Sequence, residues 1–498
     1  MNFPTSRSEI SVGKIAKRFS VSGTLDITEN GERDVAAYEK VNVNVEGGGS
    51  SIGQHIYGVR WGYDENGVIN TAGTRTDEAA EFNDPVPYVF GASQEAAIQS
   101  ALTCGSPFDD LYPWNGMVPY KDRLMGHMVA IPKFWYKWTK ADGEYLQLQV
   151  ATYAADGFQL SPAHRARNAQ DHDRDVVYIA RYHASEMLAS FTDNAPLANV
   201  TRGGLRQILS TQMTQLGQSG YSIQDYAMVW TWRMLYLVEF ANWDGQSTIG
   251  KGCGTGYDGE SDWPECDTCG GTGEVYENCE TCNGAGTVAD QGEEVECPRC
   301  GGTGKSDQPT ECSTCHGTGH VEPADAQTEP MNSGTTDNMP YHTGTMAASR
   351  DTNAQGIQYR YIEDPWAGVF EWVDGIRLGV DEDAGKGYVA VIMDPAEFSD
   401  VENGAEVFRD DPAKVPNGWI TDWTIPETEG FDWALVPVTN GESDSGTKGV
   451  LDYCGFDGPC FCVGAPWYWG PHCGPFYLGS VVASWSYVYI GARLQKIP

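Results

Sequence analysis

Four copies of the pattern CxxCxGxG lie close together in this chain and constrain its folding more than any other feature. They are CDTCGGTG (266–273), CETCNGAG (279–286), CPRCGGTG (297–304) and CSTCHGTG (312–319). Two thiolates three residues apart can bind one tetrahedral metal ion, and the following glycines let the backbone turn tightly beneath the sulfur atoms. Almost no Ile, Leu or Phe occurs between 258 and 320, so this segment cannot fold by burial alone. We therefore expect two zinc ions, each bound by four cysteines.

The predicted zinc ligands are the paired cysteines of the four repeats. They are Cys266, Cys269, Cys279, Cys282, Cys297, Cys300, Cys312 and Cys315. The surrounding segment, 253–327, resembles the cysteine-rich domain of DnaJ-type co-chaperones at all of these positions. The resemblance implies that the first repeat shares an ion with the fourth, and the second with the third. It covers this segment only, because the chain contains no His-Pro-Asp motif of a J-domain. We therefore favour a metal-stapled insertion over a chaperone-like binder that holds substrates.

The charge of the chain limits its partners. The formal net charge is -37, from 69 acidic and 32 basic residues. Nucleic acids and anionic membranes are bound through basic faces, so we expect neither as a partner. No apolar run approaches the length that spans a bilayer, and the N-terminal residues have no apolar core of a signal peptide. CxxC pairs in a chain without a secretion signal favour metal binding over disulfides.

The first part of the chain reads as a small β module at 1–46 followed by a linker at 47–55. An Asn-Gly pair at 30–31 separates two extended runs, which predicts a hairpin. The glycines and serines at 47–51 predict a flexible connection. The module resembles a β module near the N-termini of phage tail proteins from Gram-positive hosts, which implies an attachment role.

The rest of the chain carries an ordered series of motifs on both sides of the cysteine repeats. They include YGVRW, TRTDEA, SPFDDLYPWNGM and VAIPKFWYK before the repeats, then EDPWAGVFEWVDGI and YVYIGARL after them. In this order they resemble the C-type-lectin-like domain of phage tail proteins, a fold shared with formylglycine-generating enzymes and with target proteins of diversity-generating retroelements. The resemblance implies an α+β domain in two parts, 56–252 and 328–498. We read Trp366, Phe370 and Trp372 as core rings.

Two helices are expected in the first part of this domain. Apolar residues recur at helical spacing in 203–216, and those of 221–240 define one face of a second helix. The apolar runs at 127–138 and 386–393 are expected to be strands.

The last residues, 464–498, combine many rings with glycine and serine and carry almost no charge. The Gly/Pro-rich part, 464–474, predicts a loop, and 481–490 predicts a strand. Rings on a loop held by a rigid strand are typical of a binding surface. In the resembled family this region displays the ligand-binding residues. The expected contacts are Trp467, Tyr468, Trp469, His472, Phe476, Tyr477, Trp485 and Tyr487.

Several other groups of residues leave alternatives open. Four cysteines near the end could form a third metal site with His472, form two disulfides, or stay reduced; they are Cys454, Cys460, Cys462 and Cys473. The sequence around the copper-binding cysteines of formylglycine-generating enzymes is absent. The His- and Asp-rich stretch at 164–175 is more often a solvated loop than a metal site. Glu371 and Asp374 could serve a glycosidase pair, but their spacing does not single them out.

These observations favour a receptor-binding protein of a phage tail tip or tail fibre over a copper-dependent oxidase or a chaperone-like binder. The resemblance implies adhesion to a glycan or protein of a bacterial surface, attachment to other tail proteins and a homotrimer. It implies no catalytic residue, and zinc is the expected cofactor. The sequence does not reveal the receptor or whether a retroelement diversifies the C-terminal region.

Overall fold

The computed structural model describes residues 53–498, with gaps in the cysteine-rich segment and in several loops. The gaps are 92, 253–264, 271, 273, 291–292, 307–308, 315–319, 321–329, 348–354, 382–385, 407, 411–416, 440–451, 468 and 470–471. The predicted N-terminal β module and most of the predicted linker lie outside the described residues. We call the described parts of 53–252 and 330–498 the main body, and those of 253–327 the cassette.

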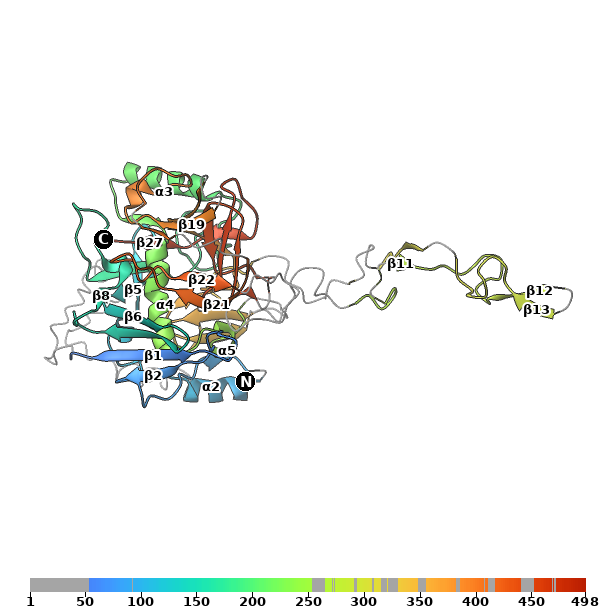
Figure 1. Cartoon of the computed structure of the whole chain (residues 1–498), viewed down its shortest axis with the longest axis horizontal. Coiled ribbons are helices and arrows are strands. Elements are labelled where there is room, and N and C mark those ends of the chain that lie inside the picture. The colour runs from blue at the N-terminus through green and yellow to red at the C-terminus, as the bar shows by residue number, and fades with distance from the viewer. Residues whose placement is uncertain are drawn as a thin grey trace, which may run out of the picture. The chain divides into compact units, whose positions relative to one another are not determined.

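The main body is a mixed, strand-rich structure built around one helix, α4 (Tyr226–Phe240), as Figure 1 shows. The side chain of Asp225 caps the helix by accepting a hydrogen bond from the backbone N–H of Met228. All of its residues are buried, so the expectation of a single apolar face is wrong. The reason is that β1 and β7 pack on α4 as well as β18, which leaves no face for solvent. The mixed architecture agrees with the expected α+β class.

Two five-stranded sheets contain the strands of the first part and the end of the chain. One has the order β2 (Thr74–Asp77), β1 (Ile56–Gly62), β7 (Tyr145–Ala151), β6 (Trp135–Ala141) and β8 (Gln159–Leu160). The other has the order β10 (Tyr221–Ile223), β27 (Leu494–Lys496), β9 (Val176–Ala180), β5 (Gly126–Pro132) and β4 (Val118–Asp122). The expected single strand at 127–138 is therefore two strands in different sheets. The break follows Pro132, which has no N–H to donate to a continuing ladder.

A nine-stranded sheet and a four-stranded sheet contain the later strands. The path of the first is β20 (Phe408–Asp410), β19 (Lys386–Val391), β18 (Phe370–Asp381), β24 (Cys460–Val463), β25 (Leu478–Val481), β23 (Tyr453–Phe456), β21 (Gly418–Thr424) and β22 (Val436–Thr439), and β26 (Ile490–Ala492) also pairs with β18. The second has the order β17 (Ile362–Glu363), β16 (Gln355–Tyr359), β15 (Gly344–Ala347) and β3 (Tyr88–Val89).

The expected terminal strand at 481–490 is also wrong. β25 ends at Val481, residues 482–489 form turns, and β26 begins at Ile490. Hydrogen bonds that close turns replace the ladder here, with the N–H of Trp485 donating to the carbonyl oxygen of Val482 at 3.0 Å. The β-branched and aromatic residues of 482–489 therefore lie in a loop between two strands, which we call the terminal loop.

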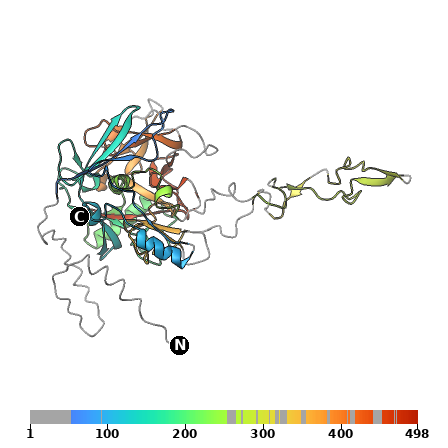
Figure 2. The same cartoon turned by 90° about the horizontal axis from the view of Figure 1, so that it is seen from below.

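The other helices lie outside this centre. Helix α3 (Arg202–Gln215) buries Leu205, Leu209 and Met213 but leaves Ile208 exposed. The sequence did not predict α2 (Gln94–Thr103), which has no buried residue and lies on the outside of the main body in Figure 2, in blue. A short α5 (Gly245–Thr248) follows α4. None of the helices in the described residues is long and apolar enough to cross a lipid bilayer.

One buried ion network joins motifs that are far apart in the sequence. Arg493 of YVYIGARL lies 2.7 Å from the carboxylate of Glu371 in EDPWAGVFEWVDGI, and His183 lies 3.0 Å from it. Arg493 also donates to the backbone carbonyls of Glu363 and Asp364 at 2.8 and 3.0 Å. Trp366, Phe370 and Trp372 are buried, which confirms that they are core rings.

Candidate metal centres and terminal aromatic surface

The second and third cysteine repeats form one compact cluster of four buried thiols. The sulfur atoms of Cys279, Cys282, Cys297 and Cys300 all lie within 4.8 Å of one another. The distance is 3.9 Å between the sulfurs of Cys279 and Cys297, and 3.7 Å between those of Cys282 and Cys300. Four sulfurs at about 2.3 Å from a tetrahedral zinc ion would be about 3.8 Å apart. The cluster therefore has the size that a metal ion requires.

Backbone N–H groups donate hydrogen bonds to two of these sulfur atoms. Gly286 donates to the sulfur of Cys282 at 3.3 Å, and Gly304 donates to that of Cys300 at 3.2 Å. Burial opposes ionisation, but the hydrogen bond from Gly304 and the neighbouring thiols lower the pKa of Cys300 to about 7. Gly286 and Gly304 both have positive φ, and a side chain at either would collide with a backbone carbonyl of the other repeat. The glycines of the repeat are therefore required for the ligand geometry.

The first and fourth repeats form a second cluster. The sulfurs of Cys266, Cys269 and Cys312 lie within 4.8 Å of one another, with 3.8 Å between those of Cys266 and Cys312. The predicted fourth ligand, Cys315, lies outside the described residues. The pairing of outer with outer and inner with inner repeats confirms the arrangement that the resemblance implied. Both clusters could hold a metal ion.

Small sheets hold the clusters in place within the cassette. β11 (Glu274–Val275) pairs with β14 (Thr310–Glu311), which joins the outer repeats. β12 (Thr287–Asp290) pairs with β13 (Glu293–Glu296) between the inner repeats. Apart from its cysteines the cassette buries little, so the metal sites are its main candidates for stabilisation.

The four cysteines near the end of the chain form neither a disulfide nor a metal cluster in the described residues. All four are buried, at Cys454, Cys460, Cys462 and Cys473, and the first three are free thiols. Burial raises the pKa of Cys460 to about 11 and raises those of Cys454 and Cys462 further. These thiols therefore pack as small apolar side chains.

Four of the expected ligand contacts lie in the core of the main body. The relative exposures are 5% or less for Trp467, His472, Phe476 and Tyr477. The ring of Phe476 lies edge-on to that of Trp243, with 4.7 Å between centroids. This placement corrects the expectation that these four residues contact a ligand at the surface. The physical reason is that side chains from α4 and β21 (Gly418–Thr424) enclose Phe476, which the loop composition alone does not predict.

The remaining expected contacts are closer to solvent. Tyr487 is 46% exposed, Trp469 and Trp485 are half-buried, and Tyr468 lies outside the described residues. The ring of Tyr487 stacks on that of Tyr489 with centroids 5.2 Å apart, and lies 5.4 Å from that of Trp485. The structure adds two exposed residues of the terminal loop that the sequence analysis missed, Val482 and Val488. They were missed because the sequence analysis assigned 481–490 to a strand.

The other candidates from the sequence are structural. The carboxylate of Glu371 is buried; although burial alone would raise its pKa, Arg493 and His183 hold it below its usual value. Asp374 is buried and paired with Arg206 at 2.5 Å, so these two carboxylates form no glycosidase pair. The histidines of the polar stretch do not cluster, since His172 is exposed and His164 is buried.

His164 is held neutral by its surroundings. Its Nε2 lies 3.0 Å from the carbonyl oxygen of Ile131, so this nitrogen carries the proton. Its Nδ1 lies 2.6 Å from the hydroxyl of Ser161, which therefore donates. Burial lowers the pKa of His164 to about 3.

We expect His164 to make the protein less stable as the pH falls. Below about pH 6.5 His164 binds a proton in the unfolded chain but not in the folded protein. The free energy of unfolding therefore decreases by up to about 1.4 kcal/mol per pH unit as the pH falls. In His164→Gln this dependence is lost, and the difference from the parent should change by about 2 kcal/mol between pH 7 and pH 5. Urea unfolding at both pH values measures it. The exposed His172→Gln is the control, and an unchanged slope in His164→Gln would contradict the assignment.

Fold and site together define an α+β protein with two cysteine clusters suited to metal and an exposed aromatic loop. A comparison with models of known protein families and with curated protein sequences finds no match to this chain.

Proposed function

We propose that this chain is a phage tail receptor-binding protein that adheres to a bacterial surface through the terminal loop of a C-type-lectin-like domain. The observation that carries the proposal is the exposure of uncharged apolar side chains on this loop. Val482, Tyr487 and Val488 are 50%, 46% and 55% exposed. Exposed apolar groups that lie together are typical of interaction sites.

The strands and rings that adjoin the terminal loop favour a rigid binding surface. β26 (Ile490–Ala492) pairs in parallel with β18 (Phe370–Asp381), in register from Phe370 with Ile490 to Trp372 with Ala492. The ring of Phe370 lies 5.7 Å from that of Trp485 and 6.2 Å from that of Tyr489. Rings that are already ordered lose little entropy when a ligand binds.

We propose zinc as the metal of both cysteine clusters. Sulfur-only tetrahedral ligation favours zinc or an iron–sulfur centre, and a compact four-thiolate site with closed coordination is typical of structural zinc. The ions would fold the cassette and take no part in catalysis. In this proposal the protein is a binding protein of the virion tail, assembled as a homotrimer whose several sites strengthen adhesion.

Replacing Tyr487 by alanine should weaken adhesion without unfolding the protein. Removal of an anchor ring costs about 2 kcal/mol or more of binding, which is roughly a thirtyfold loss of affinity. The measurement is flow cytometry of fluorescently labelled full-length protein on a panel of Gram-positive and Gram-negative bacteria. Tyr120→Ala, on the exposed strand β4 (Val118–Asp122), is the matched control.

The proposal is overturned if the parent protein binds no strain of the panel. If the parent binds but Tyr487→Ala and Trp485→Ala both bind as tightly, the adhesion surface lies elsewhere and the cassette becomes the next candidate.

A further inference from the structure

The two longest stretches of the chain without Asp or Glu are 194–224 and 458–498. In a chain of net charge -37 such stretches are conspicuous. The structure brings them side by side. The N–H of Asn199 donates to the carbonyl oxygen of Tyr487 at 3.0 Å, and β10 (Tyr221–Ile223) pairs with β27 (Leu494–Lys496). Neither the terminal loop nor α3 (Arg202–Gln215) carries an acidic residue of its own.

Helix α3 (Arg202–Gln215) and the segment that faces it also carry exposed apolar side chains. Ile208 of this helix is 52% exposed, and Met187 on the facing segment is 59% exposed. Backbone hydrogen bonds connect the chain just before Met187 to β26 (Ile490–Ala492). The N–H of Ala184 donates to the carbonyl oxygen of Ala492, and the N–H of Leu197 donates to the carbonyl oxygen of Ala184. Apolar surface thus extends beyond the residues of the terminal loop.

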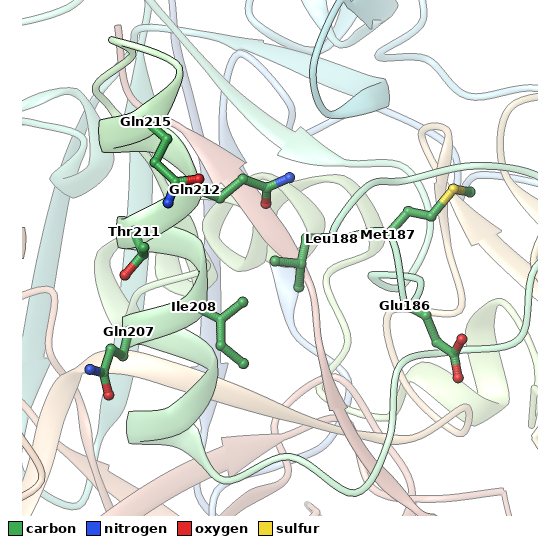
Figure 3. Close-up of a pocket in the computed structure, with 8 residues that line it drawn as sticks. All are labelled: Glu186, Met187, Leu188, Gln207, Ile208, Thr211, Gln212 and Gln215. Atoms are coloured by element: carbon green, nitrogen blue, oxygen red, sulfur yellow. The ribbon is translucent and has the colours of Figure 1, made fainter.

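A groove of about 570 Å³ separates α3 from the segment 186–188, as Figure 3 shows. Gln207, Thr211 and Gln215 follow one another at successive turns along α3, and the amide of Gln212 points from the helix toward Leu188. Ile208, Met187 and Leu188 supply the apolar lining, and Glu186 is the one charged residue that lines the groove. The volume lies in the range of small-ligand sites.

Gln212 supplies a second sign of a ligand. Its Oε1 is buried and accepts no hydrogen bond from any described residue. A buried acceptor without a donor costs about 1–3 kcal/mol, so such groups usually have a partner. When the flexible side chain of Gln212 turns into the groove, a ligand that donates an O–H or N–H satisfies this oxygen.

The composition of the groove identifies the kind of ligand. Amide and hydroxyl side chains both donate and accept hydrogen bonds, which suits a partner rich in hydroxyl groups. The aliphatic side chains can contact the C–H faces of such a partner. The groove contains neither the aromatic nor the arginine side chains that dominate protein–protein hot spots. A partner with negative charge would meet Glu186 without a compensating cation.

We propose that the groove between α3 and residues 186–188 binds an uncharged, hydroxyl-rich glycan chain of the bacterial surface. This inference rests on the proposed function and adds a second subsite near the terminal loop. The side chain of Gln212 turns into the groove and binds a sugar hydroxyl through its Oε1, and the row of Gln207, Thr211 and Gln215 binds further hydroxyls along the chain.

The test compares Gln212→Leu with the parent on the bacterial strains that the parent binds. Leucine is apolar and similar in size to glutamine, and it leaves no unsatisfied acceptor, so the melting temperature should stay equal or rise. Cell binding should weaken about tenfold. Gln218→Leu, just beyond α3 and outside the groove, is the matched control and should bind as the parent does.

Chemical treatment of the cells identifies the ligand class. Periodate cleaves vicinal diols of glycans and should abolish binding of the parent, whereas proteinase K should leave it intact. The inference is overturned if Gln212→Leu binds as tightly as the parent. It is also overturned if proteinase K abolishes binding, which indicates a protein receptor, or if Gln212→Leu instead dissociates an oligomer, which indicates that a second copy occupies the groove.

The outcomes separate the two proposals. If Tyr487→Ala loses binding and Gln212→Leu binds as the parent does, only the proposal of a glycan subsite in the groove is overturned. A parent that binds no strain overturns the proposed function and, with it, the glycan subsite.

Discussion

Each chain should bind two zinc ions, and Cys300→Ser should reduce the number to one. Cys300 is one of four buried thiols within 4.8 Å of one another, and a hydroxyl is a poor substitute for a thiolate at such a site. The apparent binding free energy of a structural zinc ion is about 10–16 kcal/mol, and in a segment with little core it is also folding free energy. The inner repeats of Cys300→Ser should therefore unfold. Elemental analysis of the purified protein counts the zinc, and limited proteolysis at 279–300 reports unfolding.

The main body should be unaffected by this change, because its core contains no zinc ligand. Cys104→Ser provides the control, since Cys104 lies outside the repeats and its replacement should leave two ions bound. The affinity for zinc should fall as the pH is lowered, because each thiolate must lose a proton before it binds. A zinc content near zero, together with disulfides between the repeats, would contradict the assignment.

Phe476→Ala should destabilise the main body by about 3–5 kcal/mol, the usual cost of truncating a buried ring to alanine. Phe476 is fully buried, and its ring lies 4.7 Å from that of Trp243 and 6.4 Å from that of Trp230. The guanidinium of Arg233 lies 5.5 Å from the same ring, so the change also removes a contact for a buried cation. Denaturant unfolding followed by tryptophan fluorescence measures the effect.

Tyr487→Ala is the matched comparison, because it truncates a ring of the same terminal region that is 46% exposed. Its effect on stability should be within about 0.5 kcal/mol, as for most surface substitutions. Equal destabilisation by the two changes would contradict the division of this region into core and surface.

The chemistry of the cysteine cassette could be read from the sequence because it depends on local spacing. Two cysteines three residues apart reach one ion whatever the rest of the chain does, and glycine is needed where φ is positive, as at Gly286 and Gly304. The spacing alone did not show which repeats share an ion; the resemblance to the co-chaperone domain implied it, and the two clusters agree.

The elements of the main body were predictable where a pattern reports a local preference. The periodicity of α3 and α4 identified two helices, and the rings at 366–372 were recognised as core. The limits of the strands were not predictable in the same way. Pro132 divides one apolar run between two sheets. Residues 482–489 connect β25, which pairs with β23 and β24, to β26, which pairs with β18.

The sequence by itself indicated the cysteine clusters suited to metal, the mixed class of the fold and the scarcity of acidic residues in 194–224 and 458–498. Only the tertiary structure decided which rings of the terminal region are exposed. Phe476 and Tyr487 lie in the same uncharged, ring-rich stretch, yet the first is buried among the rings of α4 and β21 and the second faces solvent. Only the tertiary structure, too, brought Gln212 opposite Leu188 in one groove. The physical reason is that ligand spacing and charge are properties of neighbours along the chain, whereas burial depends on which distant segments pack around a side chain.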